Sequence, residues 1–161
     1  LIMAGSTLLQ SLDSTYEDGT SRGVTPSNRR QIEYFIPSAP ISIGDAVSFD
    51  TSQTADGDKT LFVLPADTGT LTSRIFVGIA LDAAVVADVA AGTAIRVCIS
   101  GICEANISAA NAGTAGVNLM INTGGDLQDY AAGSVLQNAC MSCEARDGVT
   151  GKATVVVFKS F

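Results

Sequence analysis

Four cysteines are the residues of this chain whose type and spacing could support chemistry. Cys98 and Cys103 lie in the stretch RVCISGICEANI, and Cys140 and Cys143 enclose the stretch CMSC. Pairs of thiols at such spacings bind zinc or exchange disulfides in other proteins. The chain of 161 residues contains no histidine, so the commonest general base, the usual activator of a nucleophile and the commonest metal ligand are all missing.

A zinc site or a thioredoxin-type centre would require a particular arrangement of these thiols. Zinc needs all four thiolates to converge, but Cys140 and Cys143 on one strand would point to opposite faces of it. A redox CxxC is favoured at the start of a helix, whereas CMSC has a strand-like context without a basic neighbour. Both interpretations are therefore weak, and we expect the chain to hold no metal and no cofactor.

The interpretation that the residues favour is a β-hairpin with Ser100 and Gly101 as its two-residue turn. In that register Cys98 lies opposite Cys103 in a non-hydrogen-bonded pair, with Cα atoms about 4.5 Å apart, which a disulfide tolerates. We therefore predict a Cys98–Cys103 disulfide, which closes only a short loop and adds little stability. Cys140 and Cys143 are expected to form a second disulfide or to be buried thiols.

Other candidate loops have a structural explanation. The DGD at residues 56–58 lacks the terminal glutamate and the ligand spacing of an EF-hand, and NTGGD at 122–126 lacks the Gly-Lys-Ser/Thr of a P-loop. Turn formation by aspartate and asparagine side chains accounts for both. No nucleophile–base pair and no paired carboxylates indicate catalysis, so we expect that the chain is not an enzyme.

The charge balance excludes some classes of partner. With 16 acidic and 9 basic residues, the formal net charge is −7, and such a surface repels phosphate backbones and anionic lipid. No apolar run reaches the roughly 20 residues that a membrane-spanning helix needs, and the start LIMAGSTLLQ lacks the features of a signal peptide. We therefore expect no nucleic-acid partner and no membrane partner.

The elements that would position these residues are short strands. Residues 1–36 are predicted to be an extended N-terminal arm, because residues 11–30 are polar and rich in turn residues, and residues 37–161 to be a β-rich domain. The fold class is all-β, a compact barrel or sandwich of short antiparallel strands. The segment 82–92 (DAAVVADVAAG) is compatible with helix or strand. The runs expected to form strands, besides the hairpin, are QIEYFIP (31–37), ISIGDAVSFD (41–50), LFVLPA (61–66), RIFVGIAL (74–81), VNLMIN (117–122), SVLQNACMSCEA (134–145) and KATVVVFKSF (152–161).

A weak internal similarity accompanies this pattern. VGIALDA followed by GTAIRV resembles NACMSCEA followed by GKATVV. Because the match requires gaps, it indicates a duplicated β-unit without demonstrating one.

The order of four motifs gives a resemblance to a known family. ISIGDAVSF (41–49), FVGIALDAA (76–84), AGTAIRVCISGICEANI (91–107) and NTGGDLQD (122–129) together resemble the small capsid cement, or decoration, proteins of tailed phages. The resemblance extends over roughly residues 37 to 161 and rests on the order of the motifs. The long polar arm and the cysteines depart from the family pattern.

This resemblance implies a structural role without catalytic residues. It implies a β-rich module, commonly a homotrimer, that binds the outer surface of an assembled capsid, with the major capsid protein and further copies of itself as partners and the virion as its location. The arm would add contacts with the shell, while the alternative for its arginines is a solvated tail. The candidate capsid-contact residues of the arm are Tyr16, Arg22, Arg29, Arg30, Tyr34 and Phe35.

A second class of function stays open from the sequence alone. A secreted or surface β-sandwich that binds carbohydrate or acts as an adhesin would have a similar strand pattern. The absence of tryptophan argues against it, because sugar-binding platforms usually need exposed tryptophan or tyrosine.

Overall fold

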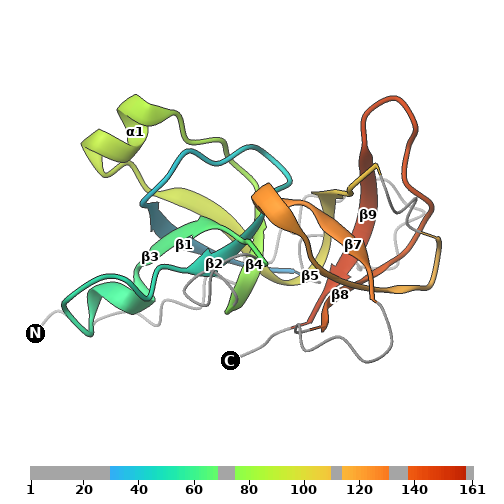
Figure 1. Cartoon of the computed structure of the whole chain (residues 1–161), viewed down its shortest axis with the longest axis horizontal. Helices are drawn as coiled ribbons and strands as arrows, with labels where there is room; N and C mark the ends of the chain where they lie inside the picture. The colour runs from blue at the N-terminus through green and yellow to red at the C-terminus, as the bar shows by residue number, and fades with distance from the viewer. Residues whose placement is uncertain (1–29, 69–74, 110–113, 131–137, 159–161) are drawn as a thin grey trace, which may run out of the picture.

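The computed structural model describes residues 30–68, 75–109, 114–130 and 138–158. These residues are mainly β, as the sequence predicts, and include a closed five-stranded barrel with further strands outside it (Figure 1). One short α-helix, α1, occupies part of the segment that the sequence left between helix and strand. The elements in chain order are β1 (Gln31–Pro37), β2 (Ala46–Phe49), η2 (Asp58–Thr60), β3 (Phe62–Pro65), β4 (Phe76–Ala80), α1 (Val86–Ala91), β5 (Ile95–Asn106), β6 (Asn118–Ile121), η4 (Thr123–Gly125), β7 (Leu127–Asp129), β8 (Asn138–Ser142) and β9 (Lys152–Val157).

The closed barrel makes up the first of two lobes. Its strands follow the order β1-β3-β2-β4-β5, and β1 pairs again with β5 to complete the circle. The only parallel pair among these strands is β1 with β3, where Pro37 lies beside Val63. We call β1 to β4 with residues 95–100 of β5 the first lobe.

Strand β5 is continuous, so the predicted hairpin at Ser100-Gly101 is wrong. Its first half pairs with β1 and β4, and its second half, from Gly101 onward, pairs with β9. Gly101 has a φ of 100°, which favours glycine because a side chain would be strained there. The glycine that looked like a turn residue therefore redirects a single strand from one lobe to the other.

The second lobe consists of residues 101–106 of β5 and of β6 to β9. Its strand order is β5-β9-β8-β6-β7. The last strand returns to the first through a parallel bridge between Ile107 and Leu127, and Ser108 N donates to Leu127 O at 2.8 Å. Figure 1 shows the two lobes side by side, with β5 running between them.

The two lobes repeat one pairing scheme, which explains the internal similarity of the sequence. Val47 pairs with Pro65 and Gly78 in the first lobe, and Leu119 pairs with Asp129 and Cys140 in the second. Each lobe has a register irregularity at the same place, directly after Val47 or directly after Leu119, and the first lobe has a further one between Gln31 and Ile32. The parallel contacts correspond as well, since β1 meets β3 as β5 meets β7. Strand for strand, β1, β2, β3, β4 and β5 correspond to the second half of β5, β6, β7, β8 and β9.

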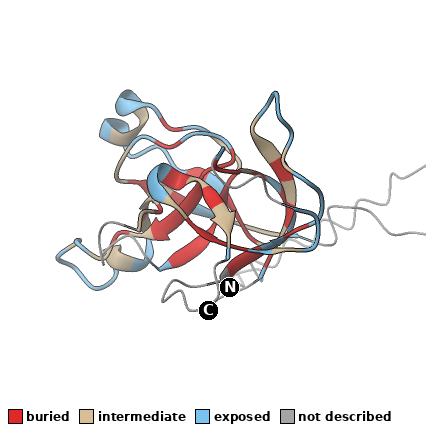
Figure 2. Cartoon of the chain, turned by 45° about the vertical axis from the view of Figure 1, so that its right-hand side comes forward, coloured by how far each residue is buried: buried red, intermediate tan, exposed pale blue. Residues whose placement is uncertain are grey.

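Two buried clusters stabilise this arrangement (Figure 2). One fills the first barrel with Phe35, Val47, Val63, Val97 and other apolar residues. The other fills the second lobe and continues to the outer face of the first barrel. The lobes therefore share one of their two cores, which holds them together without a linker.

The structure also changes the predicted boundary between arm and domain. Residues 31–36, which were assigned to the arm, form most of β1 and pair with β5 across the first barrel. The alternation of apolar residues in QIEYFIP is the reason, because it lets one face of the strand enter the core. Residues 1–29 lie outside the described part of the chain.

Candidate functional site

The bend in β5 brings together two of the four cysteines. Cys98 and Cys103 lie on either side of Gly101. The Cys98 thiol donates to Ser100 O at 3.5 Å, and the two thiols lie close enough to shift each other's pKa. Cys140 lies in the same buried cluster, because it and Gly101 flank Val157 on adjacent strands. The pair thus meets through a bent strand and not across a hairpin.

All four cysteines are free thiols in this structure. Cys98, Cys103 and Cys140 are buried, whereas Cys143 is exposed directly after β8. Cys140 and Cys143 therefore point to different environments, as strand alternation predicts, and only Cys140 is a buried thiol. The Cys98–Cys103 disulfide stays a prediction for the oxidised protein.

Two of these thiols, Cys103 and Cys140, have a raised pKa. The hydrogen bond with Cys98 and burial raise the pKa of Cys103 above its ordinary range. Burial, with a smaller contribution from Cys143, raises the pKa of Cys140 to about 12. The hydrogen bond from Cys103 lowers the pKa of Cys98, against the effect of burial. Within the described ranges, no three cysteine, aspartate or glutamate side chains come close enough to hold a metal ion.

A polar cluster connects the lobes beside the thiols. The carboxylate of Asp45 is almost buried and accepts hydrogen bonds from Ser42 N at 2.7 Å and from Asn106 Nδ2 at 2.8 Å. Asn106 Nδ2 also donates to Ile43 O at 3.2 Å, and Asn106 N donates to Gly44 O at 2.8 Å. One asparagine of β5 thus fixes the turn before β2 to the second lobe.

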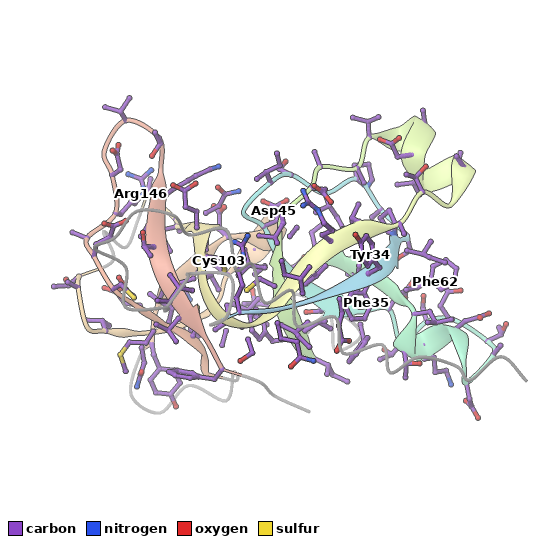
Figure 3. The ribbon with its side chains drawn as sticks, turned by 180° about the vertical axis from the view of Figure 1, so that it is seen from behind. Tyr34, Phe35, Asp45, Phe62, Cys103 and Arg146 are labelled. Atoms are coloured by element: carbon purple, nitrogen blue, oxygen red, sulfur yellow. The ribbon has the colours of Figure 1, made fainter. Side chains whose placement is uncertain are left out.

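Glycines allow the lobes to approach closely at this cluster. A Cβ on Gly125 would lie 2.8 Å from the Cβ of Asp45, and Gly125 N donates to Ala66 O at 2.9 Å. The neighbouring Asp126 has a raised pKa, mainly because of burial and then because of the charge of Asp45, while Arg146 acts in the opposite direction. We call this polar cluster between the lobes the joint; Figure 3 shows Asp45 there and Arg146 in the second lobe. The cluster fixes the turn before β2 against the second lobe and so sets how the two lobes lie against each other.

The candidate contact residues of the arm differ in their exposure in the structure. Tyr34 is 67% exposed, whereas Phe35, its neighbour on β1, is 5% exposed and packs edge-to-face on Phe49 in the first barrel (Figure 3). Phe35 is therefore a core residue and cannot contact a shell, which corrects its assignment. Arg30 is exposed just before β1. Tyr16, Arg22 and Arg29 lie outside the described residues.

Sequence reasoning missed the surroundings of Tyr34. Tyr34 pairs with Arg96 on β5, and the Arg96 guanidinium forms an ion pair with Asp82 at 2.7 Å. The hydrogen bond from Arg96 lowers the pKa of Asp82. No local signal identifies this group, because the strand pairing brings together residues that lie far apart in the chain.

A shallow groove lies near this group. Ile41, Ile43, Val85 and Val86 contribute to its lining, and Ser42 is the polar side chain among the lining residues. Ile43, Val85 and Val86 are exposed, so the groove is an apolar surface feature without charged groups.

The comparisons leave the family of the chain open. None of the helices in the described part of the chain has the length and hydropathy to span a membrane. No protein-family model matches the sequence, and no curated protein is significantly similar to it.

Proposed function

We propose that the chain is a structural virion protein that decorates and stabilises the head of a tailed phage. It binds the outer surface of the assembled shell, with the major capsid protein and other copies of itself as partners. In this proposal it has no catalytic role and contacts neither nucleic acid nor membrane.

The observation that carries this proposal is the place where the resembling motifs meet. Gly44 and Asp45 of the first motif contact Asn106 of the third and Gly125 of the fourth. Gly78 of the second motif packs on Cys98 of the third, where a Cβ would lie 2.3 Å from the backbone oxygen. Residues of all four motifs thus pack against one another within one fold, and these contacts are the support for the proposal.

The surface chemistry supports the same role. Decoration requires contact area without reactivity, and the described surface offers exposed apolar side chains such as Ile43, Val86 and Met141. Arg30 lies directly before β1, and Tyr34 lies within it. Tyrosine and arginine are enriched among residues that dominate interface energies.

The test uses heads of the phage that encodes the chain, assembled without it. The purified chain is expected to co-sediment with expanded heads to a saturating stoichiometry and to raise the temperature at which they break. Tyr34→Ala is expected to weaken this binding about tenfold or more. Val149→Ala, at an exposed loop position, serves as the matched control. Heads that bind no chain at saturating concentration would contradict the proposal.

A glycan-binding function is the second candidate, because the exposed Tyr34 lies beside the charged Asp82–Arg96 pair. Aromatic rings next to polar groups are a common way to hold sugars. A glycan array separates the two: sugar binding that Tyr34→Ala abolishes, together with no binding to heads, would favour the second candidate.

A further inference from the structure

Asn106 and Lys152 lie opposite each other on β5 and β9, beside the joint between the lobes. They are a pair of the unbroken antiparallel ladder between these strands, so both side chains lie on the same face of the sheet. The next backbone contact along the ladder is hydrogen-bonded, since Ile107 N donates to Gly151 O at 2.9 Å. Asn106 and Lys152 are therefore a non-hydrogen-bonded pair, whose Cβ atoms lie about 4.5–5.5 Å apart. The flexible four-carbon stem of lysine can cross this gap.

The amine of Lys152 is not held by a carboxylate elsewhere. The ion pairs formed within the described ranges of the chain do not include Lys152. Lys152 and Asn106 are both half-buried, so bulk water has restricted access to the space between them. The amine is thus placed beside a side-chain amide with which it can react.

A nearly buried carboxylate contacts the same amide. Asp45 is 7% exposed, and its Oδ1 accepts a hydrogen bond from Asn106 Nδ2 at 2.8 Å. Its Oδ2 accepts from Ser42 N at 2.7 Å, which fixes the orientation of the carboxylate. The nitrogen of the amide therefore faces a group that can accept a proton and return it. An amine, an amide and a carboxylate in contact are the groups that an amide exchange requires.

We propose that Lys152 and Asn106 form a covalent isopeptide bond, with Asp45 as the residue that transfers the proton. The lone pair of Lys152 Nζ forms a bond to Cγ of Asn106, and the bond between Cγ and Nδ2 breaks. The proton that Nζ gives up passes through the Asp45 carboxylate to Nδ2, which leaves as ammonia. One amide replaces another, so the step needs no oxidant, reductant or further reactant, and the fold supplies the proximity of the groups.

Such a bond fastens β9 to β5 beside the turn before β2. It cross-links residues 106 and 152, so it restricts the unfolded chain in the way that a disulfide does. Because it is an amide, it resists reducing agents, unlike the disulfide predicted for Cys98 and Cys103. The proposal does not depend on binding to a capsid.

The test measures the intact mass of the purified full chain. The wild type is expected to be lighter than its sequence by one ammonia molecule. Lys152→Arg is expected to have its full sequence mass, because a guanidinium does not attack the amide, and to melt at a lower temperature than the wild type. Lys59→Arg, the same exchange at a lysine paired with Asp56, is the matched control and is expected to keep the loss of ammonia. Circular dichroism confirms that each variant is folded.

Peptide mapping separates this bond from cyclisation of an asparagine to a succinimide, which also releases ammonia. The linked chain is expected to resist trypsin at Lys152 and to yield one branched peptide that joins Lys152 to Asn106. A succinimide leaves cleavage at Lys152 intact and persists in Lys152→Arg. Asp45→Asn keeps an oxygen that can accept from Ser42 N but cannot transfer the proton, so this variant is expected to be folded and unlinked.

Three outcomes would each overturn the proposal. They are a wild type with its full sequence mass, a loss of ammonia that persists in Lys152→Arg, and a folded Asp45→Asn that is as fully linked as the wild type. The first two decide the proposal whether or not Asp45→Asn folds. All three are measured without heads, so they do not decide the capsid proposal.

Discussion

The two lobes share a strand order, a parallel closing contact and the position of an irregularity, yet they are filled differently. In the first barrel β1 and β5 contribute Phe35 and Ile95 to the core, and their counterparts in the second lobe are Ala105 and Ala153. The second lobe contributes Leu119 where the first has Val47. The first barrel is thus filled by its own side chains, while the core of the second lobe also includes Phe76 and Ile79 from its neighbour.

This difference shows that two lobes can share the same strand pairing and still fill their interiors with different side chains. Backbone hydrogen bonds repeat from lobe to lobe, whereas the volume inside each lobe is filled by whichever side chains are within reach. The first lobe is predicted to depend on its own large residues, and the second on its contact with the first.

The largest expected effect is the loss of the aromatic ring in the first barrel. Phe35→Ala is expected to lower the free energy of unfolding by about 3–5 kcal/mol, because no neighbouring element fills the cavity. The neighbouring change Tyr34→Ala removes an exposed ring and is expected to stay within about 0.5 kcal/mol. Chemical denaturation followed by circular dichroism measures both; equal losses would refute the independent packing of the first barrel.

The next effect concerns the close contact of β4 and β5. Gly78→Ala places a Cβ 2.3 Å from the Cys98 backbone oxygen, so a strand has to move, at a cost of about 1–3 kcal/mol. The counterpart in the second lobe is Cys140, which accommodates a side chain at this position. Gly57→Ala is the control, since Gly57 has open space around it and a helical φ of −64°. Unfolding curves in which Gly78→Ala matches this control would contradict the close contact.

Oxidation of Cys98 and Cys103, on the strand that connects the lobes, is expected to change the free energy of unfolding by as much as Gly78→Ala or by less. Oxidised glutathione is expected to link Cys98 to Cys103, and the short ring limits the gain in unfolding free energy to about 2 kcal/mol. Cys140 and Cys143 are expected to stay unlinked, because one faces the core and the other faces solvent. Thiol labelling of the unfolded, non-reduced protein with mass spectrometry distinguishes two labelled cysteines from four. Four labelled cysteines after oxidation would show that the bend holds the sulfurs apart.

A smaller, pH-dependent effect is expected at the joint. The pKa of Asp126 is raised in the folded protein, first by burial and then by the charge of Asp45, so the folded state binds this proton more tightly than the unfolded state. Stability is therefore lost as the pH rises from the unfolded towards the folded pKa, and the cost persists at neutral pH. Asp126→Asn is expected to raise the melting temperature at pH 7 and to have little effect at low pH. The opposite trend would show that the charge of Asp126 supports the joint.

The smallest expected effect compares two corresponding surface carboxylates. Asp82 accepts a hydrogen bond from Arg96 N, and Glu144 accepts one from Thr154 N at the corresponding position. Side-chain hydrogen bonds from the same residues lower the pKa of both carboxylates, so each contributes stability above its unfolded pKa that is lost as the pH falls through the folded pKa. Asp82→Asn and Glu144→Gln are expected to lower the melting temperature slightly at pH 7 and not at low pH. Salt is expected to reduce only the effect of Asp82, whose partner is charged. Equal salt dependence would contradict this difference.

The sequence predicts most of the strands of this protein but not how they are connected in space. Apolar runs bounded by turn residues identify β1, β4, β6 and β9 because each strand needs one buried face. Ser100-Gly101 gives a hairpin signal from local chemistry alone, and long-range pairing with β9 overrides it. The short strand β7 is missed, since three residues are too few to show alternation.

The candidate site is predictable only in part, for a related reason. The sequence predicts that Cys98 and Cys103 are neighbours, but it does so from a hairpin register that the continuous strand β5 replaces. The contact of Asp45 with Asn106 depends on the packing of two lobes, so no local sequence pattern around either residue predicts it. Phe35 and Tyr34 are adjacent apolar residues, and only the register of β1 decides which of them enters the barrel.

The continuity of β5 has a mechanical consequence. Since one strand belongs to both lobes, a pull that separates the lobes is transmitted through the backbone of β5 to its hydrogen bonds with β1 and β4 on one side of the bend and with β9 on the other. A load applied to either lobe is thus carried by backbone that extends through the other, and the two lobes resist deformation as one body.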